Sequence, residues 1–305
     1  MPNASTILLI RPAAFGFNEE TAVNNYFQTL SSLSSEQLQH AAANEFDNMV
    51  RLLRENDIEV IVFDDTPEPE KPDAIFPNNW LSTSPDGIIS VFPMFAVCRR
   101  AEKRGDILQW LKENYLVKDV QDWSEFETEG RFLEGTGSMV IDHDNKLIYA
   151  SVSERTNISV LEKYATTNGY QAITFVATDR DGRPVYHTNV VMTLGDQFVV
   201  LCEEAIDEEW ELIAVRQLLE STGHSIIPIT KEQMHCFAGN MLQVINKSSE
   251  KYLLLSQSAL ESLCKEQKQM LEAYSRLLPI PIPIIENVEG GSVRCMIAEI
   301  FLNKK

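Results

Sequence analysis

The stretch "GSMVIDHDNKLIYAS", residues 137–151, decides the fold, because its pattern returns twice further along the chain. It predicts two apolar strands around an Asp-Asn turn, followed by a helix and a third strand. Residues 188–205 and 239–256 repeat the strand pair, and a helix and a strand are again expected after each. In the last copy these are expected at 257–278 and 280–285. The three stretches begin about 51 residues apart, which indicates an internal repeat.

Two further copies extend the repeat toward the ends of the chain. "NNWLSTSPDGIISVFPM" begins an earlier copy at Asn79, whereas "GSVRCMIAEIFL", residues 291–302, provides only the first strand of a fifth. The missing parts occur at the other end of the chain. They are an apolar strand at 7–10, an amphipathic helix at 34–57 behind a serine cap, and a strand at 58–63. The fifth unit is therefore expected to combine both termini.

The repeat predicts an α/β fold in which five strand-strand-helix-strand units surround an axis. Such a propeller leaves no sheet edge open, and the two termini would close the ring. No low-complexity linker separates the units, so residues 1–305 are expected to form one domain.

Composition narrows the classes of partner. The chain has 26 basic and 45 acidic residues and a net charge of -19, which disfavours nucleic acid. No apolar run approaches the roughly 20 residues of a membrane span, and the first residues lack the pattern of a signal peptide. We expect a soluble cytoplasmic protein with no membrane partner. Whether it forms a homo-oligomer stays open.

The five cysteines give no sign of a disulfide framework or a metal centre. Their number is odd, and no two of them have CxxC spacing. We therefore expect neither a zinc site nor any other metal.

Polar residues whose side chains can take part in catalysis or binding cluster near the starts of the first strands of the units. They are Asn78, Asn79, Glu134, His187 and Cys295. Because equivalent positions of a ring of repeats converge on its axis, these side chains are expected to share one cavity. A thiol nucleophile, an imidazole that moves protons and a carboxylate that holds a nitrogen-rich group would then lie together.

Each of these residues also has a structural interpretation. A single free cysteine is more often buried and inert, and a single histidine is more often structural. Glu134 could cap a turn, and the two asparagines are common turn residues. The expected convergence favours chemistry, and the neighbouring Arg294 and "GGS" are expected to lower the pKa of the Cys295 thiol.

Five motifs in a fixed order resemble the guanidino-group-modifying superfamily of arginine deiminases, dimethylarginine hydrolases and amidinotransferases. They are "FPNNW", "FLEGTGS", "SERT", "YHTNV" and "GGSVRCM", and they span most of the chain. "FPNNW" resembles the citrulline-utilisation hydrolase branch in particular. The resemblance implies the pentein fold, a five-bladed α/β propeller, in agreement with the repeat count.

The resemblance also implies roles for individual residues. Cys295 would be the nucleophile, His187 the general acid and base, and Glu134 the group that binds the terminal nitrogens of the substrate. Arg155 would engage the substrate carboxylate or Glu134, and Asn78 would line the substrate loop.

Arg11 and the stretch "RPAAFGFNEET" are expected to form a lid or a second contact with the substrate carboxylate, and further substrate contacts are expected at Asn79, Asp86 and Asn189. The last two mark departures from arginine deiminases. Those enzymes have a carboxylate where this chain has Ser84, with Asp86 two residues further on, and another where it has Asn189. Because a buried guanidinium needs paired negative charge, a neutral ureido group is the better expected match.

We therefore expect a cysteine hydrolase that acts on citrulline and releases ornithine, ammonia and carbon dioxide through a covalent intermediate on Cys295. The alternatives are an arginine deiminase, a dimethylarginine hydrolase, an amidinotransferase and, remotely, a non-enzymatic pentein binding protein. The partner would be a small guanidino or ureido amino acid, and this chemistry requires no cofactor.

Overall fold

The structure is a computed structural model, and it describes residues 3–305. Within these residues the strands form five three-stranded sheets, with the orders β15-β1-β2, β3-β4-β5, β6-β7-β8, β11-β10-β9 and β12-β13-β14. The strands are β1 (Thr6–Arg11), β2 (Glu59–Asp64), β3 (Leu81–Thr83), β4 (Ile88–Val91), β5 (Asp119–Asp122), β6 (Val140–Asp142), β7 (Leu147–Ser151), β8 (Gln171–Phe175), β9 (Met192–Leu194), β10 (Phe198–Leu201), β11 (Ser225–Pro228), β12 (Leu242–Ile245), β13 (Lys251–Ser256), β14 (Arg276–Ile280) and β15 (Ala298–Ile300).

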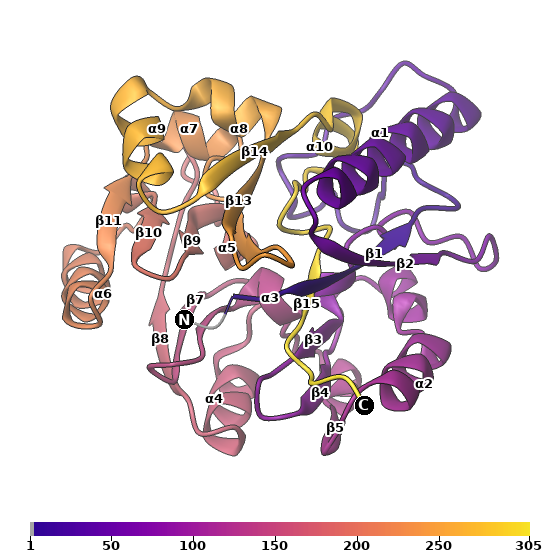
Figure 1. The fold of residues 1–305 in the computed structure, drawn as a ribbon, viewed down its shortest axis with the longest axis horizontal. Coiled ribbons are helices and arrows are strands. Elements are labelled where there is room, and N and C mark those ends of the chain that lie inside the picture. Colours follow the sequence, from indigo (N-terminus) through magenta and orange to yellow (C-terminus); the bar gives the residue numbers. More distant parts are fainter. Residues whose placement is uncertain (1–2) are drawn as a thin grey trace.

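Helices connect these strands, and the larger ones lie toward the outside of the molecule (Figure 1). The α-helices are α1 (Ser35–Glu55), α2 (Gly105–Asn114), α3 (Gly135–Ser138), α4 (Ile158–Thr167), α5 (Thr188–Val191), α6 (Glu209–Ser221), α7 (Lys231–His235), α8 (Gln257–Ser262), α9 (Lys265–Glu272) and α10 (Pro283–Glu289). Short 3₁₀ helices occur at η1 (Pro77–Asn79), η2 (Cys98–Glu102), η3 (Ser124–Glu129) and η4 (Glu203–Ala205).

All five sheets have the same internal pattern, which confirms the repeat predicted from the sequence. In each, the first strand is antiparallel to the middle strand, and the middle strand is parallel to the third. The fifth sheet combines both ends of the chain, because β1 pairs with β15 on one side and with β2 on the other. Leu8 lies opposite Ala298 in this pairing.

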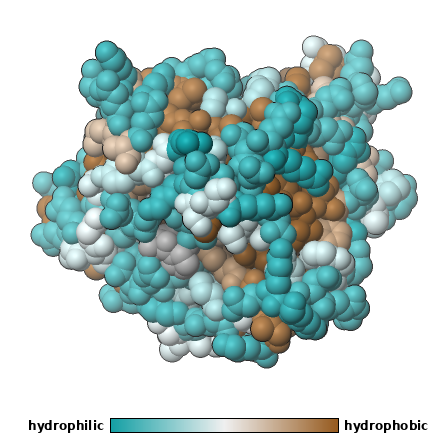
Figure 2. All heavy atoms as spheres, in the orientation of Figure 1, coloured by the Kyte–Doolittle hydropathy of each residue, from teal (hydrophilic) through white to brown (hydrophobic). Residues whose placement is uncertain are grey.

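Figure 1 shows the sheets arranged about a common centre, with the larger helices toward the outside. The same face is mostly hydrophilic, with smaller hydrophobic areas between the polar side chains (Figure 2). In the described part of the chain, no strand pairing joins one sheet to the next. The closed propeller therefore stays a prediction at this point.

Helix α1 illustrates how local sequence and packing agree. Ser34 caps it, and Gln37 completes a reciprocal capping box that satisfies two backbone N–H groups at its start. Its buried face includes Phe46, Met49 and Leu53, and this face packs into an apolar cluster that also contains residues of β1 and of α10. The expected helix at 34–57 is thus confirmed.

The repeat starts differ from the prediction in one consistent way. A helical turn, rather than the beginning of a strand, precedes the first strand: η1 before β3, α3 before β6 and α5 before β9. Residues 293–296 likewise form a turn before β15, so Cys295 lies in that turn and not in a strand. A short turn of helix leaves backbone N–H groups unpaired at its start, and polar side chains can gather there.

The segment after β13 also departs from the prediction. The expected single helix at 257–278 is interrupted between α8 and α9, and its last residues belong to β14. The expected strand at 280–285 is wrong, because Pro283 begins helix α10 instead. Proline suits the first turn of a helix, where its missing N–H has no partner to lose.

None of the helices formed by residues 3–305 combines the length and the apolar character that crossing a membrane requires.

Because the two chain ends pair in the fifth sheet, we expect that shortening a buried side chain of this sheet destabilises the protein strongly. Leu8 is fully buried, so Leu8→Ala should lower the free energy of unfolding by about 2–5 kcal/mol. Leu30→Ala is the control, because Leu30 is 76% exposed and its loss should cost less than about 0.5 kcal/mol. Urea unfolding followed by tryptophan fluorescence measures both, and equal costs would contradict this account of the fifth sheet.

Candidate active site

One buried pocket draws its lining from turns and loops of several units. Its cavity volume is about 20 Å³. The lining residues are Asn25, Asp73, Phe76, Asn79, Arg99, Arg155, Tyr186, His187, Glu289, Gly291 and Cys295. Of the residues predicted from the sequence, Asn79, Arg155, His187 and Cys295 are thus brought together, and Glu134 contacts His187 from behind the lining.

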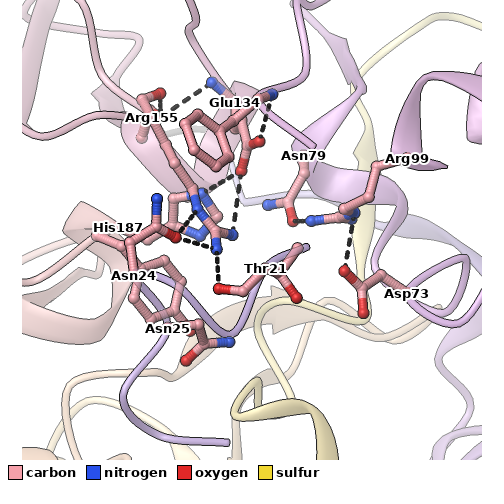
Figure 3. Close-up of polar contacts among 12 residues, drawn as sticks. Thr21, Asn24, Asn25, Asp73, Asn79, Arg99, Glu134, Arg155 and His187 are labelled. Atoms are coloured by element: carbon pink, nitrogen blue, oxygen red, sulfur yellow. Dashed lines mark hydrogen bonds and ion pairs between the residues drawn. The ribbon is translucent and has the colours of Figure 1, made fainter. Parts of the chain in front are cut away.

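Glu134 and His187 form a buried hydrogen-bonded pair. Each directly precedes a short helix, α3 and α5 respectively, so the two equivalent turns place them side by side. His187 Nε2 lies 2.7 Å from Glu134 Oε2 (Figure 3), and the backbone N–H of Phe95 donates to Glu134 Oε1 at 3.0 Å. Glu134 is fully buried. Its carboxylate therefore depends on these contacts instead of on water.

The electrostatics of this pair define its resting protonation state. Burial alone would raise the pKa of Glu134, but Arg155 and the hydrogen bond from His187 outweigh it and hold the pKa at about 2. Burial lowers the pKa of His187 to about 4, and Glu134 only partly opposes this shift. At neutral pH the acid is therefore ionised and the imidazole neutral. The ring proton lies on Nε2, where it is donated to Glu134, and Nδ1 keeps a lone pair.

Arg155 is the cation that compensates Glu134. Its Nη1 lies 3.6 Å from Glu134 Oε2, and its Nε donates to Asn24 Oδ1 at 2.9 Å. Nη2 donates to the backbone carbonyl of Thr21 at 3.1 Å (Figure 3). The guanidinium stands over the ring of Tyr186. Of the two roles expected for Arg155, the contact with Glu134 is present, and the same side chain also holds the segment that precedes α1.

The thiol of Cys295 is held by two amides. Asn240 Nδ2 lies 3.3 Å and Asn189 Nδ2 lies 3.6 Å from Sγ. Burial raises the pKa of this thiol, and the amides, the Ser292 backbone and Arg294 oppose the shift without cancelling it. The expectation of a lowered pKa is wrong, because burial outweighs these contacts. Arg294 is also directed to Glu299 and to the carbonyl of Ile297.

Three charged residues of the pocket were missed by the sequence analysis. Arg99 is fully buried in η2, makes a two-point ion pair with Glu102, and donates to Asn79 Oδ1 at 2.9 Å. Asp73 lies 3.3 Å from Arg99 Nε (Figure 3), and Glu289 ends helix α10. Their only signal was proximity to motifs, since Asp73 precedes "FPNNW" and Glu289 begins "EGGSVRC".

The remaining predicted residues lie at different distances from the pocket. Asn78 is buried beside it, where its Oδ1 accepts from Asn79, and Asn189 touches the Cys295 thiol. Asp86 is not brought to the pocket, because it pairs with Lys146 at the surface. Arg11 also does not line it, and instead forms a two-point ion pair with Asp47 of α1.

Gly137 is the residue that lets His187 and Asn79 approach each other. A Cβ atom at this position would lie 2.8 Å from His187 Nδ1 and 2.5 Å from Asn79 Nδ2. A side chain here would displace both groups, so the second glycine of "EGTG" is a spatial requirement of the site.

Residues 3–305 contain no cluster of three or more histidine, cysteine, aspartate or glutamate side chains arranged to hold a metal ion.

The sequence model of the family described as N,N dimethylarginine dimethylhydrolase, eukaryotic, matches residues 11–302. No curated protein sequence matches the chain.

Several solved structures are similar to this chain. ArgZ, an arginine dihydrolase from the ornithine-ammonia cycle in cyanobacteria, has 14% identity and a TM-score of 0.73, over 96% of this chain but only 40% of the ArgZ chain. The N-terminal domain of ArgZ bound to substrate has 15% identity and a TM-score of 0.72, over 96% of this chain and 97% of the domain. A dimethylarginine dimethylaminohydrolase adduct with S-methyl-L-thiocitrulline has 14% identity and a TM-score of 0.63, over 97% and 100%. At these identities the likeness shows a shared fold.

The buried thiol predicts slow alkylation of the ligand-free protein. Because only the thiolate reacts and burial raises the pKa of Cys295, iodoacetamide at neutral pH should label exposed Cys264 at least about tenfold faster. Labelling of Cys295 should accelerate as the pH rises. Peptide mass spectrometry follows both sites, and equal rates at neutral pH would show that the thiol is not protected as described.

The Glu134–His187 pair predicts an unusual histidine titration. The NMR signal of His187 should titrate near pH 4, and Glu134→Gln should move this midpoint lower, because Glu134 raises the pKa of the imidazole. The signal is assigned from its loss in His187→Gln. A midpoint near 6.5 in the native protein would contradict the neutral buried imidazole.

Proposed function

The chain belongs to the eukaryotic N,N-dimethylarginine dimethylhydrolase family, and from this premise we propose that Cys295, His187 and Glu134 hydrolyse the guanidino or ureido group of an arginine-like amino acid. The protein is accordingly a hydrolase of carbon–nitrogen bonds other than peptide bonds, of the guanidino-modifying superfamily that its motifs resemble. The observation that carries the proposal is the convergence of a thiol, a neutral imidazole and two arginines on one buried pocket.

The first half of the reaction forms a covalent intermediate. Nδ1 of His187 takes the proton of the Cys295 thiol, and Sγ then attacks the central carbon of the guanidino or ureido group. The protonated imidazole returns that proton to the departing nitrogen, so ammonia leaves as the carbon–nitrogen bond breaks. Glu134 stabilises the imidazolium while it exists, because it accepts from Nε2 at 2.7 Å.

The second half removes the group from sulfur. His187 takes a proton from water, the hydroxyl oxygen adds to the thio-intermediate, and the carbon–sulfur bond breaks. The departing sulfur recovers the proton, which restores both residues. From arginine the product is citrulline; from citrulline the product is a carbamate that decomposes to ornithine and carbon dioxide. In both reactions the atoms and protons are accounted for by the substrate, the side chains of Cys295 and His187, and one water molecule.

Citrulline is the substrate that we propose first. The absence of carboxylates at Ser84 and Asn189 supports a neutral ureido group, as argued from the sequence. Arginine or a methylated arginine is the second candidate, and a specific observation favours it. Asp73 and Glu289 line the pocket and supply carboxyl groups that the sequence analysis did not anticipate.

Three further expectations, on the closed propeller, the single domain and the location in the cell, are proposed together with this function. We infer a pentein propeller closed by the two termini, which the shared pattern of the five sheets supports, and one domain with a cytoplasmic location.

The central test is turnover by purified variants. The native protein, Cys295→Ala and Glu134→Gln are incubated with citrulline, arginine, methylated arginines and agmatine, and ammonia and amino-acid products are measured. Cys295→Ala should lose at least about 10³-fold in kcat, because no other group supplies the nucleophile. Glu134→Gln should lose about 10²–10⁴-fold in kcat, because the imidazolium loses its counter-charge.

Cys264→Ala is the matched control, since this cysteine is exposed, and it should retain native turnover. Product formation that requires an added amine acceptor would identify an amidinotransferase instead. Native activity in Cys295→Ala would exclude the proposed nucleophile, whichever substrate is consumed.

A further inference from the structure

Two carboxyl groups of the pocket have no role in the mechanism above. Asp73 and Glu289 both line the pocket, and both are almost fully buried. Asp73 Oδ2 accepts from Asn18 at 2.9 Å and lies 3.3 Å from Arg99 Nε, and Glu289 Oε2 accepts from Gln28 at 3.3 Å. In the described chain, the other oxygen of each, Asp73 Oδ1 and Glu289 Oε1, has no hydrogen-bond donor.

The charges around this pair do not balance if both acids are ionised. Arg155 is matched by Glu134, and Arg99 makes its two-point contact with Glu102. Asp73 has only a share of Arg99, at 3.3 Å, and no ion pair of Glu289 occurs among residues 3–305. Two buried carboxylates with less than one cation between them are costly, and like charges of this kind retain a proton.

A single proton shared by the two acids would remove one negative charge and would supply a missing hydrogen-bond donor. Asp73 and Glu289 are close enough to hydrogen-bond, and burial together with this neighbour raises the pKa of Glu289 far above its ordinary value. Two carboxylates cannot bond to each other, but a carboxylic acid and a carboxylate can. A proton on either acid therefore supplies a hydrogen-bond donor that this pair otherwise lacks.

We propose that Asp73 and Glu289 form a proton-sharing acid pair that exchanges its proton for a cationic nitrogen of the substrate. A guanidinium or an ammonium group has only donors, so it satisfies both unpartnered oxygens directly and leaves no position for the shared proton. Binding of such a group releases about one proton. The inference rests on the proposed function for its substrate, and it adds Glu289 as a residue that determines specificity.

Two sources could supply the cationic nitrogen, and four ligands separate them. Arginine carries a guanidinium and an α-ammonium, citrulline only the ammonium, 5-guanidinopentanoate only the guanidinium, and 5-ureidopentanoate neither. Isothermal titration of Cys295→Ala in two buffers of different ionisation enthalpy gives the number of protons released with each ligand.

Release of about one proton with arginine and 5-guanidinopentanoate alone assigns the pair to the guanidinium. Release with arginine and citrulline alone assigns it to the ammonium. Glu289→Gln and Asp73→Asn, each in the Cys295→Ala background, should abolish the release, because each leaves one unprotonated carboxylate at most. Release that is absent with every ligand that binds, or unchanged in both variants, overturns the proposal.

The number of protons that the pair releases on ligand binding is expected to depend on pH, and the neighbouring titratable groups must be considered with it. Arg99 and Glu102 of η2 face the pair, while Glu134, Arg155, His187, Tyr186 and Cys295 complete the titratable groups of the pocket. Burial raises the pKa of Glu102 to about 7, so its own titration must be separated from that of the pair. Proton release by the pair should fall toward zero at high pH, where the pair has already lost its proton.

A ligand-free measurement keeps the pair testable if no substrate is turned over. The infrared difference spectrum between native protein and Glu289→Gln should contain the carbonyl band of a buried protonated carboxyl group at neutral pH. Its absence from both this spectrum and that of Asp73→Asn would refute the shared proton, whatever the enzyme's activity. Lack of turnover with the band present would count against the proposed function alone.

Discussion

The active-site region is built around one buried carboxylate, that of Glu134, which must stay ionised without contact with water. Glu134 is fully buried, and the cost of removing its charge from solvent is met by Arg155, the N–H of Phe95 and His187. These contacts fix the imidazole in one tautomer. They also reach further, because Arg155 holds the segment before α1 through Asn24 and Thr21. The carboxylate is thus connected with the segment before α1, whose Asn25 lines the pocket.

The repeat explains why such a group can be assembled from distant parts of the chain. Glu134, His187 and Cys295 all lie on or beside helical turns that precede the first strands of their sheets. Equivalent turns of related units face a common region, so a carboxylate, an imidazole and a thiol meet without any being close in sequence. In the ligand-free protein the thiol is protonated and the imidazole is neutral. Proton transfer from the thiol to the imidazole is therefore expected only once substrate is bound.

Sequence reasoning succeeded where the repeat carried the information. The alternation of strands and helices predicted all five units, including the one made from both termini, and the repeat starts indicated Glu134, His187 and Cys295. It could not identify Arg99, Asp73 or Glu289. Arg99 and Asp73 lie away from the repeat starts, and the burial of all three residues, including Glu289 two positions before Gly291, depends on tertiary packing.

Motif spacing alone was also misleading at the surface. Asp86 and Arg11 stand near motif positions in the sequence, yet they form ion pairs with Lys146 and Asp47 away from the pocket. The pKa of Cys295 was misjudged because burial dominates, and the charge of Arg294 is also paired with Glu299.

The proposed chemistry requires that the buried thiol of Cys295 becomes a nucleophile. Mass spectrometry of acid-quenched protein, mixed with citrulline or arginine, measures this directly. A mass increase on the Cys295 peptide that disappears as substrate is exhausted is the predicted result, and turnover with no adduct on Cys295 at any quench time would contradict it.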